Sequence, residues 1–277
     1  MNRILRKKEL APAVKWIDVE TAVIARKALP GQFVVVRTHE QGERVPLTIA
    51  DTHSEEGYLT LIFQEVGKST KHLGMLEPGE MLADVVGPLG CPTHIEKVGT
   101  MVAVGGGIGV APVYPIAKAF KQAGNRVLSI LGARTRELLI LEEEMRSVSD
   151  EVYITTDDGS YGRHGFVTDE LKHLLDQGTK VDLVVAIGPA IMMKMVSLLT
   201  KPYMVKTLVS LNSIMVDGTG MCGACRVEVG GKTRFVCVDG PDFDGHLVNF
   251  DQLIARQRIY LPEERRANEL FESARSK

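Results

Sequence analysis

The 277-residue chain is poor in aromatic residues, which make up 5% of it with a single Trp, and its charges nearly cancel at a net −2. It has no long basic run and no basic face rich in aromatics, so nothing indicates a nucleic-acid partner. No segment reaches the roughly 18 consecutive apolar residues of a membrane span. The basic start, residues 1–8, is not followed by a long apolar stretch, so we predict no secretory signal and a cytoplasmic location. What remains is the composition of an ordinary globular protein, long enough for two domains and a small appendage.

Cysteine is also scarce, but three of the four cysteines lie between residues 222 and 237. Cys222 and Cys225 form a Cys-x-x-Cys pair on a glycine-rich stretch, and Cys237 follows. Thiolates on such a loop suit an iron–sulfur cluster or a zinc ion. In a reducing compartment, clustered cysteines favour metal binding over disulfides. Cys91 stands apart, and because only His94 is near it, we predict a buried thiol there rather than a second metal site.

Three regions follow one another along the chain. Residues 1–96 are rich in short β-branched runs separated by Pro-Gly and Gly-Pro turns, which is typical of a small closed barrel. Residues 97–205 alternate apolar strands with helix-length segments, which predicts a parallel sheet covered on both faces. Residues 206–277 hold the cysteines and a polar helical tail. The expected strands are 32–37, 59–63, 81–86, 101–104, 126–131, 151–155 and 181–187.

A glycine cluster, Gly105-Gly106-Gly107-Ile108-Gly109, comes directly after a strand and before a helix. At such a junction the bare backbone can approach a pyrophosphate, whose charge is met by free amides at the helix start. The alternative is a simple tight turn between strand and helix. No acidic residue stands at 132–136, where a ribose-binding carboxylate is expected, and Arg134 and Arg136 stand there instead. The sequence therefore leaves NAD and NADP open.

The stretch 65–70 reads Glu-Val-Gly-Lys-Ser-Thr and resembles part of a nucleotide P-loop. The P-loop requires a glycine at position 62, where this chain has Ile, so we reject an NTPase. Gly67, Ser69 and Thr70 can still bind a pyrophosphate through backbone and hydroxyl donors. A hairpin turn is the alternative.

Five short motifs follow one another along the chain. They are Arg44-Val-Pro46-Leu47-Thr48-Ile49, 66–70, Gly87-Pro88-Leu89-Gly90, 105–109 and Ile187-Gly188-Pro189. In this order, over residues 20–200, the chain resembles the ferredoxin reductase superfamily. There a flavin-binding barrel precedes a nicotinamide-binding α/β domain. Two departures from the flavin signature are present: Arg44 lies one residue further from Thr48 than usual, and Leu47 replaces the aromatic residue.

The C-terminal segment narrows the resemblance. It is similar to the branch that contains the electron-transfer subunit of dihydroorotate dehydrogenase B, whose cluster motif is C-x4-C-x2-C-x(n)-C. Here Asp217 stands first, giving D-x4-C-x2-C-x11-C. That substitution, with 44–49 and 243–253, resembles the small subunit of NADH-dependent reduced ferredoxin:NADP oxidoreductase and the sulfide dehydrogenase β subunit.

The resemblance implies a fold, a set of cofactors and a partner. The fold is a flavin-binding β-barrel (1–96), a parallel-sheet α/β nucleotide domain (97–205) and an iron–sulfur segment with a C-terminal helix (206–277). The cofactors are FAD, a [2Fe–2S] cluster and NAD(H), with NADP(H) still open. A flavin accepts a hydride and releases electrons singly, so it belongs between nicotinamide and cluster. The partner is a larger flavin and iron–sulfur subunit in a heterodimer that couples NADH, NADP and ferredoxin, with electron bifurcation left undecided.

The same resemblance gives the candidate site residues, none of them a catalytic acid, base or nucleophile. The metal ligands are Asp217, Cys222, Cys225 and Cys237. The cofactor-binding residues are Arg44, Pro46, Leu47, Thr48, Phe63, Gln64, Gly67, Ser69, Thr70, Gly87, Pro88, Leu89, Gly105, Gly106, Gly107, Ile108, Gly109, Asp157, Gly188 and Pro189.

Alternatives remain open at this point. The chain is also compatible with the dihydroorotate dehydrogenase B subunit itself, with a sulfide- or polysulfide-linked NADPH oxidoreductase subunit, and with a regulatory nicotinamide-binding module. Zinc on the three clustered cysteines with His246 would suit that last role. Asp217 would then only shape its turn. Met192, Met193 and Met195 are predicted to pack in the core, although the start of their helix can face the nicotinamide. The stretch 155–159 either lines the same cleft or is a plain loop.

Overall fold

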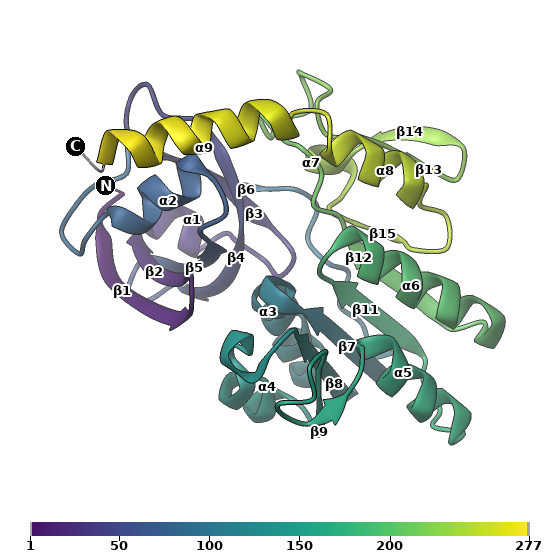
Figure 1. Cartoon of the computed structure of the whole chain (residues 1–277). Coiled ribbons are helices and arrows are strands. Elements are labelled where there is room, and N and C mark those ends of the chain that lie inside the picture. The colour runs from purple at the N-terminus through teal and green to yellow at the C-terminus, as the bar shows by residue number, and fades with distance from the viewer. Residues whose placement is uncertain (1, 276–277) are drawn as a thin grey trace.

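The structure is a computed structural model that describes residues 2–275. It consists of an antiparallel barrel, a parallel sheet between helices, and a C-terminal segment that contacts both (Figure 1). The barrel is a six-stranded sheet with strand order β1-β2-β5-β4-β3-β6. Its elements are β1 (Ile4–Ala11), β2 (Val14–Glu20), α1 (Ala22–Ala25), β3 (Phe33–Arg37), β4 (Val45–His53), β5 (Tyr58–Gln64), α2 (Lys68–Met75) and β6 (Asp84–Leu89).

The barrel core forms because apolar side chains alternate along its strands. Leu59, Leu61 and Phe63 of β5 all belong to the core inside the barrel, since every second side chain of a strand faces the same side. The sheet closes at an isolated bridge between Arg3 and Met81. Regular pairing of β6 begins only at Asp84, so the strand expected at 81–86 is shifted towards the C-terminus.

The second sheet has seven strands in the order β10-β9-β8-β7-β11-β12-β15. All pairs are parallel except β12 with β15. The strands are β7 (Thr100–Gly106), β8 (Arg126–Ala133), β9 (Glu151–Thr156), β10 (Arg163–His164), β11 (Leu183–Ile187), β12 (Lys206–Ser210) and β15 (Asp242–Asp244). The four strands predicted here are confirmed, with ends shifted by a few residues.

Helices cover both faces of this sheet, as the apolar strands predicted. The short helix η1 (Gly107–Gly109), α3 (Val110–Gln122) and α4 (Glu142–Val148) lie on one face, and η2 (Arg136–Leu138) connects β8 to α4. On the other face lie α5 (Val167–Asp176) and α6 (Ala190–Thr200), followed by η3 (Lys201–Tyr203). Met101 and Ala103 of β7 pack towards α3, while Val102 and Val104 pack towards α5 and α6. Burial on both faces explains why these strands are continuously apolar.

The C-terminal segment is not an independent body. It contains the hairpin β13 (Arg226–Val229) and β14 (Lys232–Phe235), then α7 (Val236–Asp239), β15, α8 (Phe250–Gln257) and α9 (Leu261–Arg275). Cys225 and Cys237 share one core with Phe33 and Val35 of the barrel. The segment is therefore packed directly on β3.

The last helix returns to the barrel. In Figure 1, α9 (yellow) crosses above α2. Lys71 of α2 pairs with Glu272 of α9, and the rings of His72 and Phe271 lie edge to face with centroids 6.3 Å apart. The C-terminal helix is thereby joined to the barrel through α2.

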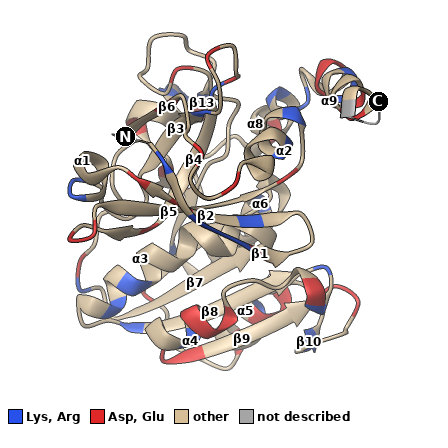
Figure 2. Cartoon of the chain, turned by 90° about the vertical axis from the view of Figure 1, so that its left-hand side faces the viewer, with Lys and Arg blue, Asp and Glu red and all other residues tan. Residues whose placement is uncertain are grey.

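Charged residues of both signs are spread over the surface. Figure 2 shows them interspersed on the face it presents, with an acidic group on α4 made by Glu142, Glu143 and Glu144. Among residues 2–275, none of the helices has the length and apolar character needed to cross a bilayer.

Candidate functional site

The four predicted metal ligands lie in two pairs. Asp217 Oδ1 is 3.4 Å from Cys222 Sγ, and Cys225 Sγ is 3.2 Å from Cys237 Sγ. Two thiolates bound at about 2.3 Å to one tetrahedral metal lie about 3.8 Å apart. Each pair is thus within reach of one shared metal ion, and two pairs suit a two-iron cluster with two protein ligands on each iron.

Backbone hydrogen bonds organise both pairs. The backbone amides of Thr219 and Cys222 donate to the Asp217 carboxylate. These hydrogen bonds lower the pKa of Asp217, and the bond from Thr219 has the larger effect. The Cys237 amide donates to Cys225 Sγ at 3.4 Å. Burial, with the hydrogen bond from Cys225, raises the pKa of the Cys237 thiol to about 12. In the metal-free chain that thiol carries a proton, which a metal must displace.

Two arginines hold the turn inside the Cys-x-x-Cys pair. Arg226 Nη1 donates to the Gly223 carbonyl at 3.1 Å, and Arg256 Nη2 donates to the Ala224 carbonyl at 3.0 Å. Their positive charges favour an anionic cluster beside them. Arg226 directly follows Cys225, whereas the sequence could not indicate Arg256, which lies far from the motif and reaches it only through α8.

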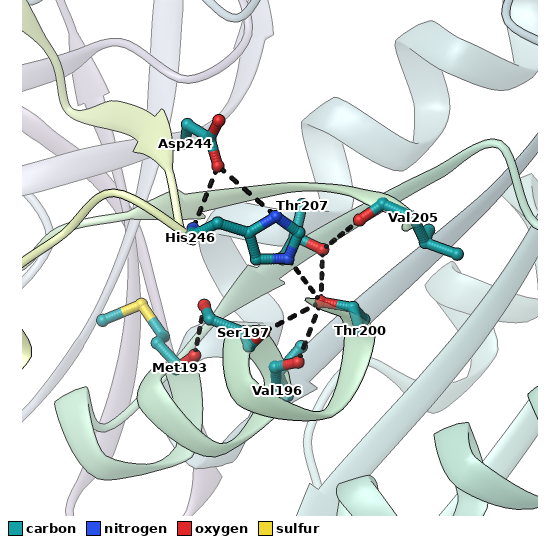
Figure 3. A network of polar contacts seen from close by, with 8 residues as sticks. All are labelled: Met193, Val196, Ser197, Thr200, Val205, Thr207, Asp244 and His246. Atoms are coloured by element: carbon teal, nitrogen blue, oxygen red, sulfur yellow. Dashed lines mark hydrogen bonds and ion pairs between the residues drawn. The ribbon is translucent and has the colours of Figure 1, made fainter. Parts of the chain in front are cut away.

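His246 is occupied elsewhere and does not complete a zinc site. Its Nε2 lies 3.0 Å from Thr200 Oγ1, and its backbone amide donates to Asp244 (Figure 3). Thr200 also accepts from Thr207, which ties α6, β12 and the turn after β15 together. Within residues 2–275, no three His, Cys, Asp or Glu side chains converge on one point. The three cysteines therefore lack His246 as a fourth ligand, and the pairing of the four predicted ligands fits a two-iron cluster better than the Cys3His alternative.

The predicted flavin-binding motif lies on adjacent barrel strands. Strand β3 pairs with β4 on one side and β6 on the other, so Thr48 and Leu89 both lie opposite Phe33. Arg44 precedes β4, is exposed and forms no ion pair with any described residue. The guanidinium of Arg44 is therefore available to a ligand beside strand β4.

Some predicted cofactor residues lie inside the barrel. Leu47 and Phe63 are buried in its core, so only their backbone is available to a ligand. Gln64 is half-buried at the end of β5. Pro46 lies opposite Val35 on the same flank as Thr48.

The stretch after β5 opens a helix rather than a hairpin. Gly67 is the N-cap of α2, and Thr70 Oγ1 accepts from the amides of Val66 and Gly67. A Cβ on Gly67 would meet nothing within 4 Å, so open space lies before the helix start. That geometry fits a diphosphate.

An acidic side chain already lies at this helix start. Glu43 accepts a short hydrogen bond from Ser69 Oγ and lies 3.5 Å from Lys68 Nζ. Its carboxylate therefore occupies donors that a diphosphate would use. The sequence motif gave no sign of it, since Glu43 lies just outside the motif that begins at Arg44.

The glycine loop 105–109 lies between two strands at the point where the strand order reverses. The chain passes from β7 outwards to β8 and β9, and then returns to β11 on the other side of β7. A Cβ on Gly109 would lie 2.1 Å from the Ile187 carbonyl oxygen, so only glycine permits this close approach. Gly107, at φ +56°, faces open space. In sheets of this kind, ligands bind at such a crevice.

Met192 fills part of this crevice. A Cβ on Gly106 would lie 2.3 Å from Met192 Sδ, and one on Gly188 would lie 2.8 Å from its Cε. Met193 is buried in the core as predicted, but the same prediction for Met195 is wrong, because its side chain lies on the exposed face of α6. Met192 thus lies beside the predicted nicotinamide site. This agrees with the alternative that the start of its helix faces the nicotinamide.

The loop after β9 lies at the same edge of the sheet. The Asp157 amide donates to the Ala133 carbonyl at 3.0 Å, and Asp157 itself is exposed. Thr155 Oγ1 is buried and has no hydrogen-bond partner among the described residues. Arg136 lies over the Tyr161 ring, whereas Arg134 is exposed and unpaired within residues 2–275.

Comparisons with known proteins agree with these two sites. Residues 103–198 match the oxidoreductase NAD-binding domain, and residues 212–249 match the iron–sulfur cluster binding domain of dihydroorotate dehydrogenase B. The chain is 48% identical to a homologue of the dihydroorotate dehydrogenase B (NAD+) electron-transfer subunit from Thermotoga maritima, over 98% of this chain and 95% of that one. With that electron-transfer subunit from Bacillus cereus it shares 32% identity, over 87% and 94% of the two chains.

The chain belongs to the family of the dihydroorotate dehydrogenase B electron-transfer subunit. It also resembles a chain in the structure of NADH-dependent reduced ferredoxin–NADP oxidoreductase, with 47% identity, a TM-score of 0.93 and 98% of each chain covered. The predictions of a ferredoxin-reductase-like fold and of an oxidoreductase subunit are confirmed. An iron–sulfur cluster and a nicotinamide as cofactors are confirmed by the two matching domain families.

Proposed function

We propose that the chain is an electron-transfer subunit that oxidises NADH at FAD and delivers electrons singly, through a [2Fe–2S] cluster, to a larger flavin and iron–sulfur partner. The observation that carries this proposal is the pairing of the ligands Asp217 with Cys222 and Cys225 with Cys237 beside the barrel strand β6. The full-length similarity to a chain of NADH-dependent reduced ferredoxin–NADP oxidoreductase supports it. The direction of electron flow can also be the reverse, towards NAD+.

The proposal gives each group of residues a task. Asp217, Cys222, Cys225 and Cys237 hold the cluster. Arg44, Pro46 and Thr48 hold the flavin on one flank, and the start of α2 at Gly67, Ser69 and Thr70 binds its diphosphate. Gly87, Pro88 and Leu89 form the strand beside it. The loop 105–109, Asp157, Gly188 and Pro189 receive the nicotinamide nucleotide.

The protein's own contribution is position and electrostatics, because no residue must act as nucleophile or general acid. Flavin, when bound, supplies the conversion between two-electron and one-electron chemistry. The crevice between β7 and β11 orients the nucleotide, and the helix starts of α2 and α3 neutralise phosphate charge. Arg226 and Arg256 stabilise negative charge at the cluster.

The same proposal covers organisation and location. The domain boundaries 1–96, 97–205 and 206–277 are supported by sheets built from residues 4–89 and 100–210. Two strands of the predicted last segment, β12 at its start and β15, nevertheless belong to the second sheet. Free cysteines suited to metal binding favour the cytoplasm.

An anaerobic titration of the purified chain with NADH and then NADPH tests the proposal. Bleaching of a bound flavin, followed by the EPR signal of a reduced cluster, is the expected result, and the two titrations establish the preferred nucleotide. A colourless preparation that contains zinc and no flavin would overturn it.

The main rival, the dihydroorotate dehydrogenase B subunit itself, is disfavoured by Asp217 and by the lower identity of 32%. Mixing the chain with a dihydroorotate dehydrogenase catalytic subunit tests this rival. Reduction of NAD+ by dihydroorotate in the mixture would favour it.

A further inference from the structure

The segment 89–93, which begins at the last residue of β6, lies between the barrel and the cluster segment, residues 212–249. Towards the barrel, the Gly90 carbonyl accepts from Gln32 Nε2 at 2.7 Å, and the Thr93 amide donates to the Pro30 carbonyl at 2.9 Å. These bonds fix the backbone of the segment to the start of β3. The segment therefore moves with the barrel.

The other side of segment 89–93 contacts the cluster segment through alternate residues. Leu89 Cδ1 lies 2.9 Å from the position of a Cβ on Gly218. The Cys91 amide donates to the Gly240 carbonyl at 2.6 Å, and its thiol donates to the Val238 carbonyl at 3.1 Å. Thr93 Oγ1 donates to Asp242 at 2.5 Å. The backbone turns at Gly90, where φ is +79°, and Leu89, Cys91 and Thr93 all contact the cluster segment.

Two of these contacts lie one residue from a predicted cluster ligand. Gly218 follows Asp217, and Val238 follows Cys237. Asp217 and Cys237 belong to different ligand pairs, so each pair is fixed at one point. At its other end, the segment begins at Leu89, the last of the predicted flavin contacts on β6.

The side chain of Cys91 differs from the prediction. It is exposed rather than buried, so the expectation of a buried thiol was wrong. Its thiol is nevertheless directed to the Val238 carbonyl, and its amide adds the hydrogen bond to Gly240. Both hydrogen bonds connect segment 89–93 to the backbone that follows Cys237.

We propose that segment 89–93 fixes the separation of flavin and cluster, with Cys91 as a positioning residue for the electron transfer between them. The inference rests on the proposed function. In each transfer the reduced flavin loses one electron and the cluster gains one, while no bond is made or broken. The rate of such a step falls steeply with distance, so a contact that holds the two sites together controls it.

The test compares Cys91→Ala and Cys91→Ser with wild type, in the full chain loaded with FAD and cluster. Anaerobic stopped-flow mixing with NADH separates flavin reduction from cluster reduction, and EPR reports the order of the cluster. Hydrogen exchange reports local opening at residues 91 and 240. Val86→Ala, an exposed change on β6, five residues before Cys91, is the matched control.

In Cys91→Ala, protection from exchange at residue 91 should fall about fivefold, the change in opening that the loss of one neutral hydrogen bond brings. Cluster reduction should slow and the EPR signal broaden, while flavin reduction by NADH keeps its rate and KM. Cys91→Ser retains a donor and should restore all three readouts.

Two outcomes would overturn the inference. One is a Cys91→Ala variant whose cluster phase and EPR signal equal those of wild type. The other is an equal slowing of flavin and cluster reduction, which would reveal a general loss of structure. If wild-type chain binds neither flavin nor cluster, the proposed function itself fails, and this result is distinct from either outcome.

Discussion

The loop 105–109 and the loop 217–225 are both rich in glycine, yet they are held in different ways. The first ends a buried strand and packs on β11, where Gly109 lies against the Ile187 carbonyl. The second lies between Ser210 of β12 and Arg226 of β13, a stretch without strand or helix. Core packing therefore shapes the nucleotide loop before any ligand arrives, whereas the cluster loop depends on its metal and on segment 89–93.

The largest effect should follow from removing a buried cluster ligand. Cys237→Ala is expected to abolish cluster binding, because it leaves one iron with Cys225 alone, and iron analysis with EPR measures the loss. Flavin content should stay unchanged, since the barrel has its own core. Cys91→Ala, with its thiol outside the pairs, should retain iron. Loss of flavin together with the cluster would contradict the contrast drawn between the two loops.

A methyl group at Gly109 should disrupt the other loop. Its Cβ would meet the Ile187 carbonyl oxygen at 2.1 Å, and overpacking of this kind lowers the free energy of unfolding by about 1–3 kcal/mol. KM for NADH should rise as well, measured by steady-state reduction of an artificial electron acceptor. Gly178→Ala strains an open turn elsewhere and should leave KM unchanged. An unchanged KM in Gly109→Ala would show that this loop does not receive the nucleotide.

The half-buried ligand Asp217 should matter less than the buried thiols of Cys225 and Cys237. Asp217→Ala removes one of the two ligands in the pair Asp217 and Cys222. We expect the half-life of the cluster in the presence of a chelator to fall by at least about tenfold. Its EPR signal should also change. The same signal and potential as in wild type would mean that Asp217 only shapes the turn.

Met192 offers a smaller test of the preformed crevice. Met192→Ala removes the thioether that lies against Gly106 and Gly188, and KM for NADH should fall about fivefold if entry requires its displacement. Met195→Ala, an exposed change on the same helix, is the control. An unchanged KM would show that the side chain leaves the nucleotide path free.

The smallest effect concerns the helix start of α2. Glu43→Gln removes a carboxylate that competes with a diphosphate for Ser69 and Lys68, so FAD should bind about two- to fivefold more tightly, as expected for a solvent-exposed charge. The gain should shrink as salt is added. Titration of flavin-free chain by fluorescence measures it, with Glu40→Gln as control. Weaker binding in Glu43→Gln would mean that Glu43 helps to form the site.

The sequence predicts best where structure is local. Strand alternation located β5, and continuous apolar runs located β7, β8, β9 and β11 to within a few residues. The order of the motifs gave the fold and the family. The three cysteines and Asp217 were assigned to one site, and the structure places them in two pairs.

The rest depended on contacts between distant segments. Nothing near Arg256 or Glu43 in sequence indicates what they contact, because α8 and the loop before β4 bring them there. Cys91 was judged by the usual burial of thiols, but its place between two segments leaves it exposed. His246 was a plausible ligand by spacing, and only the packing of α6 against β12 shows it engaged with Thr200.

The contact between α9 and α2 has a consequence for the order in which the protein matures. During synthesis the barrel emerges first and can fold as a unit, with the flavin-side helix α2 still uncovered. Lys71 and His72 gain Glu272 and Phe271 as partners only when α9 has left the ribosome. Until α9 has emerged, α2 is thus uncovered at Lys71 and His72, and α9 then packs against it there.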